Sequence, residues 1–581
     1  MKNRMLPFYQ AIPRLLLYQF VSFIILSFVT WGISTLCSLL MGLSGKAAIT
    51  SGDLGFLFTH WQGYVIIVLV LLMVLCYMAI ELNALVLYCD RLLDGDKPSV
   101  WQCMKEGFAA LKKYGCKHGV LLIVYAVFLA PILGFGFSIS LTGSFYIPRF
   151  ITSVIASKPL LLTVVIIALA VLTVYIILNC FIMHGALLGG MTLKESSAAS
   201  QKLVKRNWKN FIPEILIFIG LTLLVTVILL VVFSGLPLLI VRAIPMGEQA
   251  LLFWEIFFCS LLMVVLLFMM LMAISFLMIK LSTLYRKYQT EGKWQYQKKE
   301  KKRHPFVIMA GALVLAVCIL FSIFGAFHFD EVFHTQITAE IIGHRAGGYD
   351  APENTVKGIE TAYELGAAGS EIDIQRTSDG YYVVNHDADF SRVAGVDKKP
   401  SEMTLAEVKE LRVDGEPVPT LEETLEAARD KVVLFVELKG ETADEQMADD
   451  AVRIIKEMGM EDQTVLISLK YGLLEYIEQK YPEMQTGYLA FISFGQIEET
   501  PFDYMALEEE ISTDNTIEAI HNKDKMIMVW TVNEEDDIEY FMTSDADAII
   551  TDSVKLAGEI KEQLKERDPL QIIIQKILSW I

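Results

Sequence analysis

Two hydrophobic patterns divide this sequence of 581 residues. In the first half, apolar residues form seven unbroken stretches, each long enough for the roughly 20 residues that a membrane-spanning helix needs. The stretches cover residues 15–40, 63–88, 120–145, 160–191, 212–241, 250–279 and 306–327. Pro131 and Pro237 fall inside the third and fifth stretches, where we expect a kink or a break. This pattern predicts an α-helical multi-pass membrane domain of about seven spans over residues 1–329.

In the second half, short β-rich runs alternate with amphipathic helical stretches. Candidate strands lie at residues 341–344, 371–375, 432–438, 464–468, 485–489, 504–507, 526–531 and 548–551. Candidate helices lie at residues 355–365, 421–428, 444–458, 473–480, 515–523 and 534–544. Such alternation over roughly 230 residues predicts a parallel α/β barrel of the TIM type, which we place at residues 338–568. The active site of such barrels gathers at the C-terminal ends of the strands.

Charge separates the two halves as sharply as hydropathy does. Residues 1–329 carry 27 Lys and Arg against 12 Asp and Glu, whereas residues 330–581 carry 22 against 55. The acidic second half argues against a nucleic-acid partner, because binding a phosphate backbone requires clustered cations. All eight Cys lie between Cys37 and Cys318 without metal-ligand spacing, so the sequence predicts no disulfide framework.

The basic residues of the first half predict its orientation. Lys and Arg concentrate in the N-terminal segment and in the second, fourth and sixth loops, the last of which carries nine between Lys280 and Arg303. Loops rich in Lys and Arg stay in the cytoplasm. Seven spans then place everything after residue 327 outside the cell membrane, so we predict a multi-pass protein with an extracytoplasmic barrel.

Ionisable residues recur at the predicted strand ends. His344 and Arg345 follow the first strand; His can transfer protons near neutral pH, and Arg offers a planar fork for phosphate. Glu371 and Asp373 lie two apart on the second strand and therefore share one face. Each motif alone also fits a structural role, a turn before a helix cap for the first and an exposed strand edge for the second.

Three further motifs extend this set. His386 ends an apolar run, and Glu437 and Lys439 close the third strand. Buried carboxylates repel one another unless a cation holds them, and all-oxygen ligation favours Ca²⁺ or Mg²⁺. Lys439 could bind phosphate or pair with Glu437, and Trp530 could line a substrate pocket or pack in the core. Their convergence on strand ends favours a common metal-dependent site.

Residues 341–552 resemble the glycerophosphodiester phosphodiesterase family. The matching motifs are His-Arg followed by Pro-Glu-Asn-Thr at 352–355, Glu-x-Asp, His-Asp, Pro-Thr-Leu-Glu at 419–422, Glu-x-Lys, Trp-Thr-Val-Asn and a late Thr-Asp. Ala346 departs from the pattern, because the family usually has Gly after His-Arg. The first half resembles the membrane domain fused to some members of the family, a likeness that rests on hydropathy and architecture.

The resemblance implies a metal-dependent hydrolase of glycerophosphodiesters that yields sn-glycerol 3-phosphate and an alcohol. It implies roles for seven side chains: a metal site of Glu371, Asp373 and Glu437, an acid/base pair of His344 and His386, and phosphate ligands Arg345 and Lys439. The glycerol 2-hydroxyl would attack phosphorus, and water would then open the cyclic phosphate. Two bases on opposite sides suit such an in-line displacement.

Alternative functions remain open from the sequence. A membrane-tethered enzyme could act on lipids like a lysophospholipase D, or on a glycerophosphate polymer. A transporter or receptor could use the barrel only to bind its ligand, and Glu81 and Glu255 are the carboxylates near or within spans that bear on this. Glu81 is expected near a helix end.

The last residues, 569–581, predict an amphipathic tail. Leu570, Ile573, Ile574, Ile577 and Ile581 recur at helical spacing, so that one face is apolar. This tail either packs on the protein or lies on the outer leaflet of the membrane.

Overall fold

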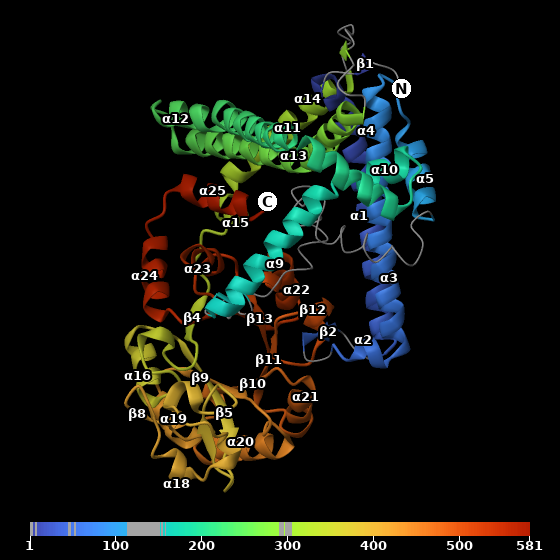
Figure 1. Cartoon of the computed structure of the whole chain (residues 1–581). Coiled ribbons are helices and arrows are strands. Elements are labelled where there is room, and N and C mark those ends of the chain that lie inside the picture. The colour runs from blue at the N-terminus through green and yellow to red at the C-terminus, as the bar shows by residue number, and fades with distance from the viewer. Residues whose placement is uncertain are drawn as a thin grey trace. The chain divides into compact units, whose positions relative to one another are not determined.

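The computed structural model describes residues 4–5, 8–44, 48–51, 54–112, 152, 155–156, 158–289, 295–296 and 305–580. The predicted span at 120–145, with Pro131, lies outside the described residues. Two compact units divide the chain. Unit 1 consists of Met1–Leu36, Val65–His328 and Lys576–Ile581, and unit 2 of Cys37–Tyr64 and Phe329–Gln575. Figure 1 labels their elements.

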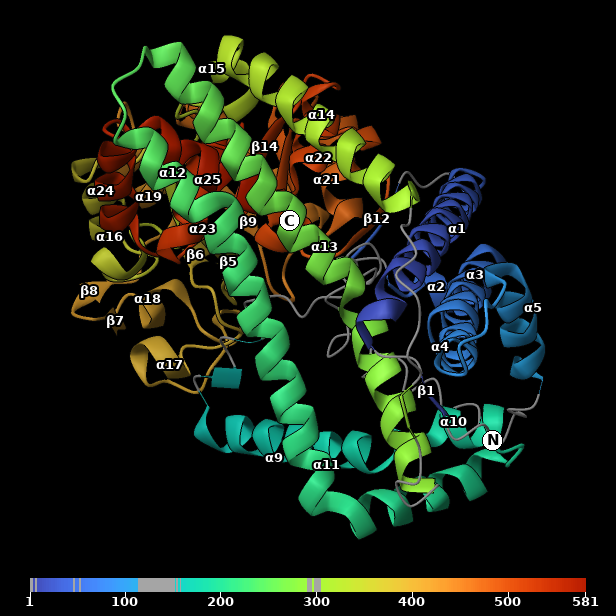
Figure 2. The ribbon, with the colours of Figure 1, turned by 90° about the horizontal axis from the view of Figure 1, so that it is seen from above.

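Unit 1 is built from long apolar helices. Its described elements are β1 (Arg4–Met5), α1 (Phe8–Gly42), α3 (Trp61–Tyr77), the π-helix η2 (Met78–Ala84), α4 (Leu85–Leu93), α5 (Val100–Leu111), α9 (Pro159–Leu178), α10 (Ile182–Leu188), α11 (Leu193–Leu230), the π-helix η3 (Val231–Gly235), α12 (Leu236–Arg242), α13 (Glu248–Gln289), β3 (Gln295–Tyr296) and α14 (Pro305–Phe327). Figure 2 shows α13 as one uninterrupted helix.

Six of the seven predicted spans fall on described residues, and each corresponds to a helix long and apolar enough to cross a membrane. These helices cover Gln10–Gly42, Trp61–Leu93, Pro159–Leu188, Leu193–Arg242, Glu248–Gln289 and Ile308–Phe327. Pro237 lies in the first turn of α12, directly after the π-helix η3. A proline inside a continuous helix removes one backbone hydrogen bond and crowds the preceding turn, and the wider π-helical turn of η3 accommodates it. The kink or break predicted at Pro237 is therefore a π-helical turn within one continuous helix.

The two carboxylates considered within the spans are both buried. Glu81 lies in η2, where Ser22 of α1 donates to its carboxylate and Gln19 donates at 3.4 Å. Glu255 accepts a hydrogen bond from Arg242 at 2.6 Å. The expectation that Glu81 lies near a helix end is wrong, because the helix continues without a break to residue 93.

Unit 2 contains a closed barrel of eight parallel strands, which confirms the predicted fold class. The strands are β4 (Glu340–Gly343), β5 (Gly369–Arg376), β9 (Val433–Leu438), β10 (Thr464–Ser468), β11 (Gln485–Ala490), β13 (Tyr504–Glu508), β14 (Met526–Trp530) and β15 (Ala548–Thr551). They pair in the order β4-β15-β14-β13-β11-β10-β9-β5, and the pairing of β4 with β5 closes the ring. Each strand overlaps a range predicted from the sequence.

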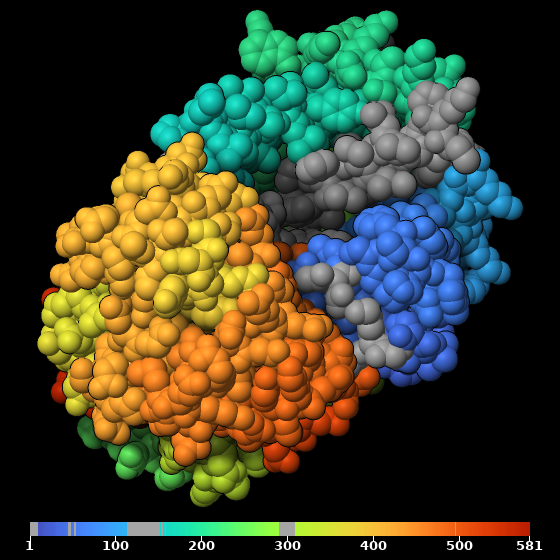
Figure 3. Space-filling model, turned by 90° about the horizontal axis from the view of Figure 1, so that it is seen from below, coloured from blue at the N-terminus to red at the C-terminus, as the bar shows by residue number. Residues whose placement is uncertain are grey.

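Helices connect the strands and cover the barrel. They are α16 (Val356–Glu364), α19 (Leu421–Ala428), α20 (Glu445–Glu457), α21 (Tyr471–Lys480), α22 (Asp514–His521), α23 (Glu535–Met542) and α24 (Val554–Leu564). Figure 3 shows residues of this unit, in yellow and orange, packed into a continuous surface. Thr355, Thr420 and Asp444 cap the N-termini of α16, α19 and α20 with their side chains, the usual role of these residue types at that position.

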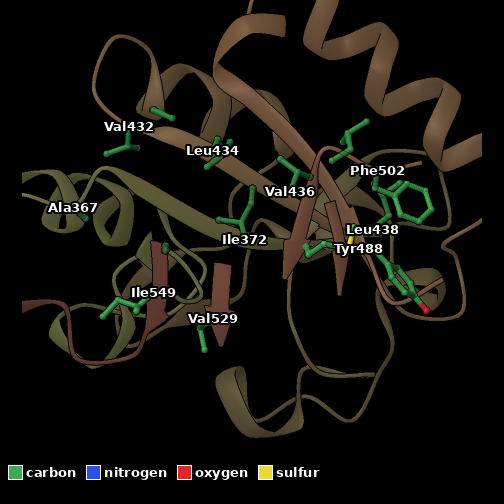
Figure 4. Packing of buried hydrophobic residues seen from close by; sticks show 14 of the residues in the cluster. Ala367, Ile372, Val432, Leu434, Val436, Leu438, Tyr488, Phe502, Val529 and Ile549 are labelled. Atoms are coloured by element: carbon green, nitrogen blue, oxygen red, sulfur yellow. The ribbon is translucent and has the colours of Figure 1, made fainter. Parts of the chain in front are cut away.

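Alternation along the strands separates two apolar cores. On β9, Leu434, Val436 and Leu438 belong to the larger core between strands and helices, part of which Figure 4 shows. Phe435 faces the other way, into a smaller core that fills the barrel interior together with residues of the other strands. Because side chains on a strand alternate, Glu437 shares the inward face with Phe435. The same alternation that builds the core therefore places a carboxylate inside the barrel.

An insertion follows β5 before the chain reaches α19. The short strand β6 (Tyr382–Val384) pairs antiparallel with β5, and α17 (Ser391–Ala394), α18 (Leu405–Val408), β7 (Arg412–Val413) and β8 (Glu416–Pro417) follow it. His386, which the sequence places at the end of an apolar run, therefore follows the returning strand of a hairpin and not a strand of the barrel ring. Because β6 runs back along β5, the Asn385 N–H donates to the Asp373 carbonyl at 2.9 Å.

Two short segments remain to be placed, the one before the second span and the C-terminal one. The residues before the second span contribute β2 (Ala48–Thr50) and α2 (Phe56–Thr59) to unit 2, where β2 pairs with β12 (Ser493–Gly495). The C-terminal residues form α25 (Pro569–Ser579), in which Ile573 and Ile577 are buried. The Trp580 ring meets the Phe321 ring of α14 edge to face at 6.0 Å. These are the contacts of a helix packed on protein; a place on the membrane surface stays a prediction.

Candidate active site

Three buried carboxylates meet at the C-terminal ends of two neighbouring barrel strands. Glu371 and Asp373 lie on β5, and Glu437 lies on β9 directly opposite Asp373. Their exposed fractions are 3%, 0% and 6%. One carboxylate oxygen from each residue lies within 4.8 Å of the others. The structure thus brings together the three metal ligands predicted from the sequence, and the set could hold a metal ion.

The Lys439 ammonium lies against these carboxylates. Its Nζ donates to Asp373 Oδ1 at 2.8 Å and to Glu437 Oε2 at 3.0 Å. Burial raises the pKa of Glu437 to about 7 even though the Lys439 charge opposes this rise. Burial, together with the charges of Asp373 and Glu437, raises the pKa of Glu371 well above its ordinary range. One ammonium is therefore too little positive charge for three buried carboxylates.

The loop after β4 orients two of the carboxylates. The backbone N–H of Arg345 donates to Glu371 Oε2 at 2.8 Å. The Asn354 side chain donates to Asp373 Oδ2 at 2.9 Å and accepts from the Asp373 backbone N–H at 3.2 Å. Arg345 and Asn354 both have positive φ, at 49° and 55°, a conformation that Asn adopts more readily than most residues. The loop conformation thus serves to point hydrogen-bond donors at the carboxylates.

His344 is fixed by a carboxylate on the neighbouring strand end. Its Nδ1 lies 2.7 Å from Asp552 Oδ1, and Asn533 donates to Asp552 Oδ2 at 2.8 Å. Burial would raise the pKa of Asp552, but the hydrogen bonds from His344 and Asn533 outweigh burial, and the pKa lies below its ordinary range. An ionised Asp552 accepts the proton of Nδ1, which leaves Nε2 of His344 for proton transfer.

His386 has a similar arrangement. Its Nδ1 lies 2.9 Å from Asp387 Oδ1, and Arg392 Nε donates to Asp387 Oδ2 at 2.6 Å. Gln375 of β5 holds this turn by donating to the carbonyls of Asn385 and Asp387 at 2.7 and 2.6 Å. Burial lowers the pKa of His386 although the nearby Asp373 opposes this change. The structure therefore gives both imidazoles a carboxylate partner on Nδ1.

The Arg345 guanidinium has an unsatisfied donor. Its Nε is buried without a hydrogen-bond partner among the described residues, and its Nη1 lies 3.6 Å from Glu353 Oε2. Buried N–H groups in folded proteins are nearly always paired. A phosphate oxygen would provide the acceptor that this donor lacks.

Family models match nearly the whole chain. Residues 1–323 match the membrane domain of glycerophosphoryl diester phosphodiesterase, and residues 344–556 match the glycerophosphoryl diester phosphodiesterase family. A glycerophosphodiester phosphodiesterase from Caldanaerobacter subterraneus subsp. tengcongensis is 30% identical over 231 residues, which cover 36% of this chain and 93% of that protein. The chain belongs to the glycerophosphodiester phosphodiesterase family.

Further relatives of the family match the same region. A glycerophosphodiester phosphodiesterase from Bacillus altitudinis is 27% identical over 249 residues, covering 39% of this chain and 99% of that protein. The crystal structure of a glycerophosphodiester phosphodiesterase from Thermotoga maritima is 28% identical with a TM-score of 0.33, covering 38% of this chain and 96% of that chain. A phosphodiesterase from Oleispira antarctica, solved with the product sn-glycerol-3-phosphate, is 24% identical with a TM-score of 0.37, covering 39% and 98%.

Ala346 distinguishes this phosphodiesterase from the family pattern noted in the sequence. Its φ is 77° and its side chain is fully buried. A non-glycine residue in this region costs roughly 1–2 kcal/mol. Nearby, Gly348 with φ 62° cannot be replaced, because a Cβ there would lie 2.2 Å from the Asp552 carbonyl oxygen. Close packing against the Asp552 backbone, rather than a substrate contact, thus accounts for this glycine.

Trp530 of the phosphodiesterase lies at the end of β14. Its indole Nε1 donates to the Ala506 carbonyl at 2.8 Å, and the side chain packs partly buried against the interior core. This hydrogen bond anchors the ring to the barrel wall. Core packing is therefore observed, and substrate contact stays a prediction.

Four residues that orient the predicted site residues were not predicted in that role. The sequence indicated Asn354 only as part of a helix cap and Asp552 only as a residue at a strand end, and it assigned no role to Asp387 or Asn533. Each lies inside or beside a recognised motif: Asn354 ends Pro-Glu-Asn, Asp387 follows His386, and Asn533 ends Trp-Thr-Val-Asn. Their partners, however, lie up to 208 positions away. Only the closed barrel shows which motif each of them supports.

Proposed function

We propose that this chain is a membrane-anchored phosphodiesterase that hydrolyses glycerophosphodiesters to sn-glycerol 3-phosphate and an alcohol. The observation that carries this proposal is the cluster of three buried carboxylates at the barrel mouth. Two imidazoles, each held through Nδ1 by a carboxylate, accompany the cluster. The name and activity of its relatives support the same substrate class.

Glu371, Asp373 and Glu437 would hold one divalent cation, Ca²⁺ or Mg²⁺. The donors are all oxygens, which these ions prefer. The raised pKa values of Glu371 and Glu437 indicate that the cluster lacks positive charge. When bound, the cation would supply charge that stabilises the phosphate oxygens in the transition state.

His344 and His386 would act as the acid/base pair. One Nε2 accepts the proton of the attacking hydroxyl, and the other imidazole donates a proton to the leaving alkoxide oxygen. Asp552 and Asp387 fix each ring by its Nδ1, so that Nε2 is the atom presented to substrate. These carboxylates are positioning residues in this proposal.

Arg345 and Lys439 would carry the positive charge that binds phosphate. The buried Arg345 Nε, which has no acceptor in the part of the chain that the structure describes, supports this role. Lys439 lies on the carboxylates in the structure, so its ammonium would stand between the metal ligands and a bound phosphate. Trp530 would form the wall of the pocket beside the substrate.

The test uses the purified full-length chain and glycerophosphoglycerol, with sn-glycerol 3-phosphate as the measured product. We expect His344→Ala and His386→Ala each to lower turnover at least about 10²-fold while substrate still binds, the usual scale for an acid/base group. Glu371→Gln and Asp373→Asn should lower both affinity for the divalent cation and turnover. Wild-type rates in chelating buffer would refute the metal site, and near-normal rates in a His variant would remove that residue from the mechanism. Parallel assays with lysolipid and glycerophosphate polymer distinguish the alternative substrates.

We also propose a location and a division of the chain. Residues 1–329 form the membrane domain in the cell membrane, residues 338–568 form the catalytic domain outside the cytoplasm, and residues 569–581 form a tail. The alternation of basic loops supports this orientation. Protease added to intact cells should digest the catalytic domain, with a cytoplasmic protein as the control for lysis. An intact barrel after proteolysis, cleaved only when the membrane is broken, would show the opposite orientation.

A further inference from the structure

The segment that precedes the second span is built into the barrel unit. Strand β2 pairs antiparallel with β12 in the register Thr50 with Ser493, Ile49 with Phe494 and Ala48 with Gly495. The Ser51 N–H extends the ladder by donating to the Ile492 carbonyl at 3.1 Å. Figure 1 labels β2 and β12 side by side. A part of the chain that the sequence predicts only as a connection between two spans is therefore a strand of unit 2.

Burial shows that this segment is an integral part of the unit. Ala48, Ile49 and Thr50 are 8%, 1% and 2% exposed, and Ala48 belongs to the main core of the barrel. The Thr50 hydroxyl hydrogen-bonds the Tyr488 hydroxyl in a buried position. The Tyr488 ring packs against that of Phe502 at 5.5 Å. A connecting loop that only passes over a surface is normally exposed.

The location of β12 relates this segment to the active site. β12 lies in the connection that leaves the C-terminal end of β11, and this end of the barrel carries the catalytic carboxylates. In a ring of eight strands, β11 is four strands away from β4 in either direction and thus lies across the mouth from His344. A substrate whose phosphate lies at the carboxylates of β5 and β9 extends its remaining groups over the mouth toward the other strands.

We infer that residues 48–51 help to determine substrate specificity as part of the active-site rim. These residues would hold the connection after β11 in position to contact the alcohol moiety of the substrate. This inference rests on the proposed phosphodiesterase function. It means that the barrel without the N-terminal part of the chain lacks one strand of its substrate-binding rim. The N-terminal domain would then complete the enzyme besides anchoring it.

The pairing also constrains the path of the chain through the membrane. Thr50 and Ser493 can pair only if they lie on the same side. The described residues between them include five candidate spans, beginning with Trp61–Leu93 and ending with Ile308–Phe327. Five crossings would place the two strands on opposite sides, so the pairing requires one more.

The first experiment tests the pairing in the full-length protein. Ser51 and Ile492 are joined by a backbone hydrogen bond, so the next pair, Thr50 and Ser493, is a non-hydrogen-bonded pair with Cα atoms about 4.5 Å apart. This separation suits a disulfide. We expect Thr50→Cys with Ser493→Cys to yield a linked peptide pair after oxidation, identified by mass spectrometry. Thr50→Cys with Glu499→Cys, in the same connection but outside β12, is the matched control. No link, or equal linking in the control, would overturn the inference.

The second experiment tests specificity. Thr50→Val keeps the shape of the side chain and removes the hydroxyl that meets Tyr488. Because this contact helps to hold β2 against β11, we expect the ratio of KM for glycerophosphocholine to KM for glycerophosphoglycerol to change at least about threefold, with kcat nearly unchanged. Thr50→Ser should restore the wild-type ratio. Unchanged ratios in an active Thr50→Val enzyme would refute the role in specificity. A wild-type protein that hydrolyses neither diester would instead refute the proposed function.

Discussion

Glu437→Gln should stabilise the metal-free barrel while it impairs the enzyme. Burial raises the pKa of Glu437 from its ordinary value of 4.5 to about 7. When folding raises the pKa of a carboxyl group, the folded state is destabilised relative to the unfolded state at high pH. This destabilisation begins as the pH rises past the pKa in the unfolded chain and is complete above the pKa in the folded protein. The rise from 4.5 to about 7 corresponds to about 3 kcal/mol of free energy of unfolding lost above pH 7. A glutamine removes the charge and keeps an oxygen that can accept from Lys439.

The assay is urea unfolding of the full-length chain in detergent with chelator present, followed by pulse proteolysis of the barrel. At pH 8 we expect Glu437→Gln to be about 3 kcal/mol more stable than the wild type, and the difference to vanish near pH 4. The exposed Glu475 on α21 is the control position, where Gln should change stability by less than about 0.5 kcal/mol. Added Mg²⁺ or Ca²⁺ should reverse the order if the proposed metal site is correct, because Glu437→Gln removes one of its three carboxylate ligands. A variant that is less stable than the wild type at pH 8 in chelator would refute this reasoning.

Three more predictions concern the residues that support the site. Asp552→Asn should lower turnover at least about 10²-fold, since the Nδ1 proton of His344 loses its ionised acceptor; unchanged pH–rate profiles would argue against this. Asn354→Gly keeps the positive φ but removes the amide on Asp373, and should weaken divalent-cation binding about 10- to 100-fold by calorimetry. Ala346→Gly should change the free energy of unfolding by less than about 1 kcal/mol, because relief of backbone strain and loss of a buried methyl nearly cancel; a larger change in urea titrations would contradict that balance.

The barrel and its carboxylates could be predicted from local sequence because both follow from strand periodicity. In β5, Ile372 and Ile374 face the helices, so Glu371 and Asp373 had to share the inner face. Apolar length alone predicted the spans that lie on described residues. These features depend on residues a few positions apart, which a single sequence displays directly.

The remaining features depend on contacts between distant segments. The place of His386 follows from β6 folding back on β5, and a short apolar run does not distinguish a hairpin strand from a barrel strand. The place of Glu81 follows from a π-helical stretch whose carbonyl at Ile80 accepts from the Tyr18 hydroxyl at 2.5 Å. The pairing of β2 has no local signal, since a strand of three residues gains its stability from its partner.

The pairing of β2 with β12 has a consequence for the biogenesis of the protein. Thr50 and Tyr488 are 438 positions apart in the chain. At roughly 5–20 residues per second, ribosomes complete the partner segment about 20 to 90 seconds after β2 has been made. Throughout this interval β2 keeps an unpaired strand edge, the kind of edge that promotes wrong pairing. Docking of β2 must therefore be among the last steps of assembly, and a chain that stops before residue 493 leaves this strand without its partner.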